Sequence, residues 1–175
     1  MNRCDSGPDT IGQLNATDAM SATEILLLNL EEVRRRSLIV WRGIPPERAH
    51  WKPDDEAMTC IEMVRHVLEG ECLYTEMLNV RRSVPEGPTP FTGRPFTTID
   101  DEIAFSAPFR AALVRLVQSI RPEELRTLKV DRSDKGYVRA VGDFILRMGY
   151  HEAVHTGQLL AYLRAMGVPR PNIWD

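Results

Sequence analysis

Apolar residues recur at spacings of three and four along four long stretches of the chain, separated by segments rich in proline, glycine and polar residues. Such spacing places apolar side chains on one face of an α-helix. The alternation of apolar and polar residues that indicates a strand is not found between these stretches. The pattern therefore predicts an all-α protein with four helices, at residues 25–41, 59 to about 82, 98–120 and about 138–166.

Two of the predicted helices begin at a recognisable capping sequence. Ser21-Ala-Thr-Glu24 precedes the first helix, and Thr59-Cys-Ile-Glu62 opens the second. In each, the hydroxyl and the carboxylate satisfy backbone amides that have no partner within the helix. Pro108 leaves two alternatives for the third helix, a kink or a restart of the helix capped by Ser106.

The segment between the second and third helices cannot form regular structure. Residues 83–97 contain four prolines and two glycines, which predicts a long crossover loop. We expect Phe91, Arg94 and Phe96 to pack one end of the protein, although they also suit a cover over a pocket mouth. Four helices with one long crossover predict a four-helix bundle. We expect a single domain at residues 21–175 and a loose N-terminal tail at residues 1–20.

Composition and charge exclude several classes of function. The 175 residues carry a net charge of −3, which offers no electrostatic footprint for nucleic acid. No run approaches the roughly 20 apolar residues of a membrane span, and the first residues lack the apolar core of a signal peptide. Cys60 and Cys72 lie about 18 Å apart along one helix, too far to form a disulfide. We therefore expect a cytoplasmic protein that binds neither nucleic acid nor membrane.

Three of the four histidines occupy positions on the apolar stripes. His151 and His155 stand one helical turn apart in the last helix, and His66 stands in the second, so we expect all three to face inward. Three neutral imidazoles on facing helices bind a divalent metal and leave one coordination position open, as catalytic sites do. The alternative is a set of buried histidines hydrogen-bonded to carboxylates such as Glu62 or Glu69.

His151-Glu-Ala-Val-His155 also matches the His-Glu-x-x-His signature of zinc peptidases, in which the glutamate is the general base. No Glu or His follows His155 to complete such a site, and no predicted strand offers an edge for a peptide. We therefore consider a peptidase the least favoured function and expect Glu152 to pair with an arginine. Gly149 and Gly157 flank the histidines, where the missing side chains allow another helix to approach closely.

The two histidine motifs resemble those of the DinB-like superfamily of four-helix-bundle proteins. The resemblance covers residues 21–166 and includes His50-Trp-Lys-Pro53 before the second helix and His-Glu-x-x-His-x-Gly-Gln in the last. It implies that His66, His151 and His155 bind a divalent transition metal, most often zinc or nickel, and that the protein forms a homodimer. Gln158, three residues after His155, is the candidate whose side-chain amide would orient a ligand of the metal.

The resemblance also implies a class of reaction. Characterised members include transferases and isomerases that use low-molecular-weight thiols, while most members have no known reaction. We expect a metal-dependent enzyme that joins such a thiol cosubstrate to a small electrophilic substrate. No catalytic side chain is assigned. Arg81, Arg82 and Arg94 are candidates to hold a carboxylate of the thiol, with a solvated charged rim as the alternative. The competing hypothesis is a metal- or ligand-binding stress-response protein without turnover.

Overall fold

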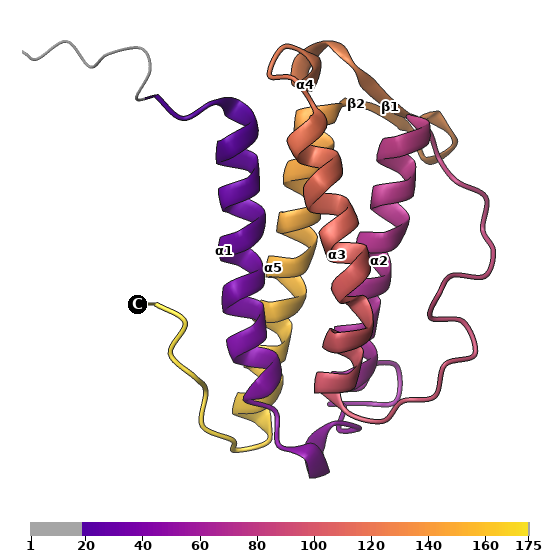
Figure 1. The fold of residues 1–175 in the computed structure, drawn as a ribbon. Helices are drawn as coiled ribbons and strands as arrows, with labels where there is room; N and C mark the ends of the chain where they lie inside the picture. The colour runs from indigo at the N-terminus through magenta and orange to yellow at the C-terminus, as the bar shows by residue number, and fades with distance from the viewer. Residues whose placement is uncertain (1–18, 175) are drawn as a thin grey trace, which may run out of the picture.

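The computed structural model describes residues 19–174 and is a four-helix bundle (Figure 1). The predicted fold class, all-α with one long crossover, is confirmed. The predicted tail, residues 1–20, lies outside the described residues except for its last two positions. The four long helices are α1 (Ala22–Arg42), α2 (Cys60–Val80), α3 (Ile99–Ser119) and α5 (Val141–Ala165).

Both predicted capping boxes form and determine where α1 and α2 begin. The hydroxyl of Ser21 accepts from the amide of Glu24, and the Glu24 carboxylate accepts from the amide of Ser21. Thr59 and Glu62 make the same pair of bonds before α2. Each box satisfies two amides that the first helical turn leaves without a partner. After α1, a 3₁₀ turn (Pro46–Arg48) begins the connection to α2.

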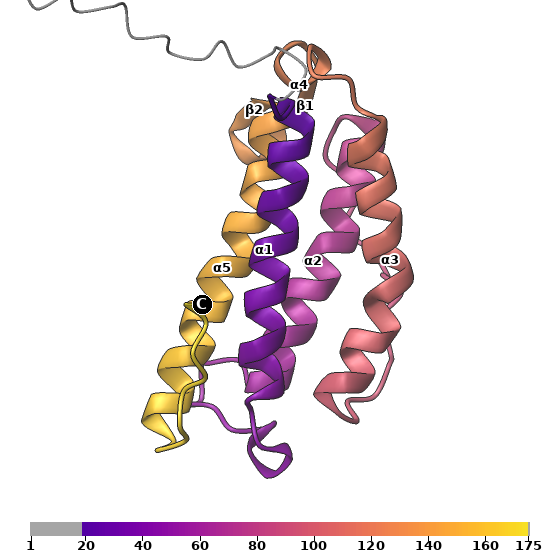
Figure 2. The same cartoon turned by 60° about the vertical axis from the view of Figure 1, so that its left-hand side comes forward.

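The order of the helices in space explains the long crossover. α1 packs against α3 and α5, and α2 packs against α3 and α5, so the four helices form a closed ring. α2 and α3 run in the same direction, and the segment between them returns along the length of the bundle (Figures 1 and 2). A short turn joins only antiparallel neighbours, so this parallel pair requires a long connection.

The crossover loop packs on α2 and α3. Phe91 is 2% exposed and meets the rings of Phe105 and Phe109 on α3. Arg65 of α2 donates to two loop carbonyls, and its guanidinium lies 3.6 Å from the ring centre of Phe96. The prediction that these aromatic side chains pack the protein is confirmed.

α3 continues through Pro108 as one helix, which decides between the two alternatives left by the sequence. The Ser106 hydroxyl donates to the carbonyl of Ile103 and does not cap a new helix. Proline has no amide hydrogen, so it cannot donate to the carbonyl four residues earlier. The helix therefore lacks one backbone bond without ending there.

The expectation of no strands is wrong for residues 129–140. After a short helix, α4 (Glu124–Thr127), strands β1 (Lys129–Arg132) and β2 (Tyr137–Ala140) form an antiparallel pair joined by a 3₁₀ turn (Ser133–Lys135). Within β1 only Val130 is buried, so no alternating apolar pattern marks the strands. Because residues 137–140 are strand, α5 begins at Val141 and not near residue 138.

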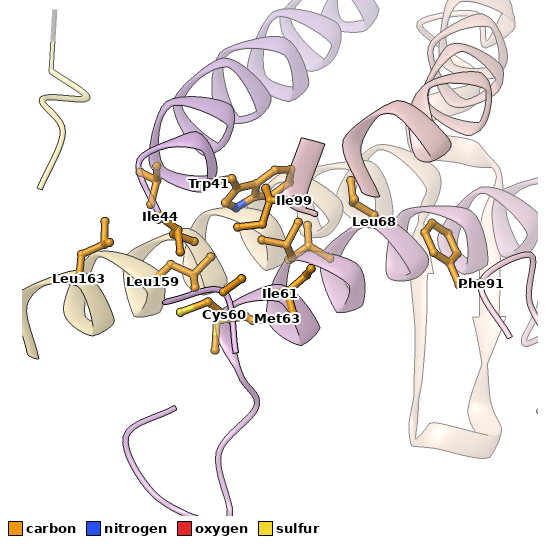
Figure 3. Packing of buried hydrophobic residues seen from close by; sticks show 14 residues of the cluster. Trp41, Ile44, Cys60, Ile61, Met63, Leu68, Phe91, Ile99, Leu159 and Leu163 are labelled. Atoms are coloured by element: carbon orange, nitrogen blue, oxygen red, sulfur yellow. The ribbon is translucent and has the colours of Figure 1, made fainter. Parts of the chain in front are cut away.

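Residues from all four long helices meet in the core (Figure 3). Trp41 from α1, Ile61 from α2, Ile99 from α3 and Leu159 from α5 belong to one cluster, towards the end of the bundle where α1 ends. A second cluster, around Phe144, occupies the other end. In the described part of the chain, no helix is both long enough and apolar enough to cross a membrane.

Candidate metal centre

The three predicted histidines come together between α2 and α5. One ring nitrogen from each of His66, His151 and His155 lies within 4.8 Å of the other two. The Nε2 atoms of His66 and His151 are 3.1 Å apart. The three ring centres are separated by 4.6 to 5.0 Å. The spacing of one turn between His151 and His155 gives the pair, and the packing of α2 on α5 brings the third imidazole to it.

The expectation that all three histidines face inward is wrong. His66 is exposed, and His151 and His155 are half-buried. The stripe that defines the inner face of a helix is wide, and residues at its margin lie where two helices meet near the surface. The cluster is therefore open to solvent on one side, which gives a small molecule access to it.

The space for the His151 ring depends on a glycine. A Cβ placed on Gly70 of α2 would lie 3.2 Å from Cε1 of His151 and 3.7 Å from its Nδ1. The ring of Tyr74, one turn further along α2, meets His151 edge to face with the ring centres 5.7 Å apart. Gly70 and Tyr74 together determine how closely this imidazole approaches α2.

Gln158 contacts His155, as its position three residues further along α5 suggested. The side-chain oxygen of Gln158 lies 2.7 Å from Nδ1 of His155. An amide oxygen only accepts, so Nδ1 carries the proton and Nε2 keeps its lone pair. This bond holds the ring with Nε2 free to bind a ligand.

The surroundings lower the pKa of two of the histidines. For His66, which is exposed, partial loss of hydration where the ring meets its neighbours and then the nearby His155 ring lower the pKa, against a smaller opposing effect of Glu69. For His151, burial followed by His155 and His66 lowers the pKa to about 4. Both causes disfavour the charged imidazolium. At neutral pH these rings are therefore neutral, the state in which an imidazole nitrogen binds a metal.

Beneath the histidines lies a buried group of charged side chains. Arg34 of α1 donates to both oxygens of Glu152, at 2.7 and 3.0 Å, and to Oε2 of Glu71 at 3.1 Å. Arg110 of α3 donates to the same Oε2 at 2.5 Å. Glu152, the glutamate of the His-Glu-x-x-His sequence, is 4% exposed and pairs with an arginine as expected. It does not belong to the histidine cluster.

Sequence reasoning did not single out Arg34, Glu71 or Arg110. The signal is present in α1, where Arg34 stands at helical spacing between the buried Leu30 and the buried Ser37. A charged residue on an apolar stripe indicates a buried partner on a facing helix. The sequence does not say which helix supplies that partner.

The carboxylates proposed as partners for buried histidines have other roles. Glu62 completes the cap of α2, and Glu69 accepts a hydrogen bond from the hydroxyl of Thr89. Among the candidate arginines, Arg94 pairs with Asp101 and lies over the ring of Phe105. Arg94 therefore holds the crossover loop on α3.

The expectation for the two glycines of α5 is confirmed at one position. A Cβ on Gly149 would lie 2.8 Å from Oδ1 of Asn29, because α1 approaches closely there. A Cβ on Gly157 would meet no atom within 4 Å. In the described part of the chain, no other helix makes a close contact at Gly157.

Two comparisons with known proteins agree with this architecture. The sequence model of the DinB superfamily matches residues 29–159, a span that includes all three histidines. The fold is similar to the crystal structure of a DinB-like protein from Bacillus subtilis, with a TM-score of 0.65, 18% sequence identity, and coverage of 86% of this chain and 98% of the other. No functionally curated protein matches the chain. Because the superfamily match spans most of the sequence, the chain belongs to the DinB superfamily.

Proposed function

We propose that His66, His151 and His155 hold a divalent transition metal, zinc or nickel, and that the protein uses it as an enzyme of small-molecule chemistry. The observation that supports this proposal most directly is the convergence of one nitrogen from each ring within 4.8 Å. Membership of the superfamily supports it independently. The predicted homodimer and cytoplasmic location remain predictions.

The donor atoms fit such an ion. Two nitrogens bound at about 2.0–2.1 Å in tetrahedral geometry stand about 3.3 Å apart. His66 Nε2 and His151 Nε2 are already 3.1 Å apart, and the rings of His66 and His151 have lowered pKa values that keep their lone pairs free. Imidazole ligands suit zinc, nickel, copper and iron, so the donor set selects for transition metals and against calcium or magnesium.

We further propose transfer of a low-molecular-weight thiol to a small electrophile. A divalent metal held by three imidazoles lowers the pKa of a thiol or water that reaches its open position. The described cysteines are poor nucleophiles, since burial raises the pKa of Cys60 to about 11 and that of Cys72 to about 12. The thiolate is therefore supplied by a cosubstrate, and the solvent-exposed side of the cluster at His66 admits it.

Metal content tests the first part of the proposal. Protein loaded with zinc or nickel is expected to contain one ion per chain. His66→Ala and His151→Ala are each expected to reduce the content well below one, because two imidazoles hold the ion weakly. Elemental analysis measures the ion, and far-ultraviolet circular dichroism verifies that the helices persist. His50→Ala, a change of the remaining histidine outside the cluster, is the control and keeps full occupancy. Undiminished metal in both cluster variants would refute the assignment.

Thiol conjugation tests the second part. Metal-loaded protein is expected to accelerate the reaction of a low-molecular-weight thiol with a chlorobimane, measured by fluorescence, and His155→Ala is expected to abolish the acceleration. The panel comprises bacillithiol, mycothiol, glutathione, cysteine and coenzyme A. If the protein binds one ion per chain and accelerates none of these reactions, it is not a transferase for these thiols. The remaining hypotheses are then a binding protein without turnover and a metal-dependent hydrolase.

The buried pairing of Glu152 weighs against a peptidase. Its two oxygens are occupied by Arg34, so the carboxylate is not positioned to accept a proton from water at the histidines. Cleavage of casein that a chelator blocks would contradict this assignment.

A further inference from the structure

A small cavity lies directly beside the proposed metal centre. It has a volume of about 10 Å³ and is bounded by Leu30 of α1, Val67, Glu71 and Tyr74 of α2, and Met148, His151 and Glu152 of α5. A buried water occupies a space of about this size when it finds two or more polar partners. Glu71, Glu152 and His151 bring polar groups to its wall, and both oxygens of Glu152 already accept from Arg34.

One oxygen of Glu71 has no partner among the described residues. The side chain is nine-tenths buried, and Oε2 accepts from Arg34 and Arg110. Oε1 is also buried and accepts no hydrogen bond from the described residues. A buried carboxylate oxygen without a donor is costly, so a donor is expected next to it.

The second nitrogen of the His151 ring lies beside α2, close to the residue that precedes Glu71. Nε2 of the ring faces His66, and the edge that carries Cε1 and Nδ1 lies against Gly70, the residue before Glu71. In the described part of the chain, Nδ1 of His151 makes no hydrogen bond, unlike Nδ1 of His155, which is bonded to Gln158. A proton on Nδ1 leaves the Nε2 lone pair directed at the cluster centre.

We propose that Glu71 positions His151 through one water bound in this cavity. The water donates to Oε1 of Glu71 and accepts from Nδ1–H of His151. Arg34 and Arg110 hold the Glu71 carboxylate, which is the final acceptor of these hydrogen bonds. The proton therefore stays on Nδ1 of His151, and Nε2 of the same ring is free to bind the metal. Glu71 is thus a positioning residue for the proposed metal site, on whose existence its functional role rests. Carboxylates that fix the far nitrogen of a ligating imidazole in this way raise metal affinity.

Glu71→Gln tests the direction of the hydrogen bonds that run from His151 through the water to Glu71. The amide oxygen of the new side chain would stay with the two arginine donors, which turns its NH₂ group towards the water. The water would then accept from the amide and donate to the ring, so His151 is expected to move its proton from Nδ1 to Nε2. Long-range ¹H–¹⁵N spectra of metal-free protein distinguish the two tautomers. Zinc affinity, measured by competition with a chromophoric chelator, is expected to fall about 10- to 100-fold.

Two further variants separate this role from a structural one. Val67→Ile extends a side chain into the cavity and displaces the water while it leaves the charged side chains intact, and the Nδ1–H preference of His151 is expected to weaken. Glu76→Gln changes an exposed glutamate of the same helix and is expected to alter neither the tautomer nor zinc affinity. If the Glu71→Gln variant does not fold, the tautomer of His151 measured in the Val67→Ile variant still tests the proposal.

The outcomes distinguish this inference from the proposed function. An Nε2–H tautomer of His151 in the unmodified metal-free protein would overturn the inference, as would an unchanged tautomer in both Glu71→Gln and Val67→Ile. Protein that binds no zinc but shows the Nδ1–H tautomer and its loss on both substitutions would refute the metal centre while the hydrogen-bonded water stands.

Discussion

At the residue scale, two glycines near the histidines have opposite surroundings. At Gly70 a methyl group would crowd the His151 ring, whose Cε1 lies 3.2 Å from where the Cβ would be, so the ring would have to shift by a few tenths of an ångström. Gly157 stands in open space in the middle of α5. Glycine in a helix interior costs about 1 kcal/mol relative to alanine, so alanine gains helix propensity at both positions. Only at Gly70 does it also displace a proposed ligand.

Gly70→Ala is therefore expected to weaken zinc binding about tenfold or more, because the His151 ring moves away from His66. Its free energy of unfolding changes little, since helix propensity offsets the crowding. Gly157→Ala is expected to stabilise the protein by about 0.5–1 kcal/mol and to leave zinc binding unchanged. Urea denaturation and chelator competition measure the two effects. Equal zinc affinity in the two variants would show that Gly70 does not control the ring.

At the scale of elements, one arginine joins α2, α3 and the crossover loop. Arg65 makes two bonds to Glu102 of α3, at 2.6 and 2.8 Å, and Glu102 is fully buried. The remaining donors bind the carbonyls of residues 94 and 95, and the guanidinium lies over Phe96. A planar group with several donors can make these contacts at once, whereas an ammonium cannot.

Arg65→Lys is expected to keep the bundle helical and to release the loop. The loss of two or more buried hydrogen bonds lowers the free energy of unfolding by about 2 kcal/mol. Limited proteolysis with chymotrypsin is expected to cut after Phe91 or Phe96 several-fold faster than in the unmodified protein, as followed by mass spectrometry. Arg82→Lys, an exposed change at the start of the loop, is the control. Equal protection of residues 83–97 in both variants would contradict this role.

At the scale of the whole molecule, a layer of charge separates the two apolar clusters of the core. Arg34 lies between Leu30 of one cluster and Trp41 of the other, and Glu152 likewise lies between Met148 and Leu159. The layer is at the level of the histidines, since Glu152 adjoins His151. Burying this charge contributes little net stability, yet removal of one member leaves its partner unpaired. The buried charged groups next to the proposed centre thus contribute less stability than apolar packing in the same place would.

Glu152→Gln is expected to lower the free energy of unfolding by about 3 kcal/mol, because Arg34 loses a bidentate partner in a buried place. Urea denaturation followed by circular dichroism gives the value, and Glu76→Gln is expected to change it by less than about 0.5 kcal/mol. The variant should retain its metal, since the carboxylate is directed at Arg34. A stability equal to that of the unmodified protein would mean that the charged layer is solvated.

The sequence by itself determined the elements that depend on local interactions. The capping boxes at Ser21 and Thr59 and the helical spacing of apolar residues established where α1 and α2 begin and that the protein is a helical bundle. The i,i+4 spacing alone made His151 and His155 neighbours. The proline-rich segment 83–97 predicted the crossover, because proline excludes regular structure wherever the chain goes.

Only the tertiary structure decided how these elements meet. The strands at 129–140 carry no alternating pattern, since their pairing buries a single side chain of β1. The packing of α2 on α5 sets the distance of 3.1 Å between the Nε2 atoms of His66 and His151. The same packing leaves His66 exposed. The partners of Glu71 come from α1 and α3, far away in the sequence. Contacts of this kind depend on the summed packing of all four helices, which no local pattern encodes.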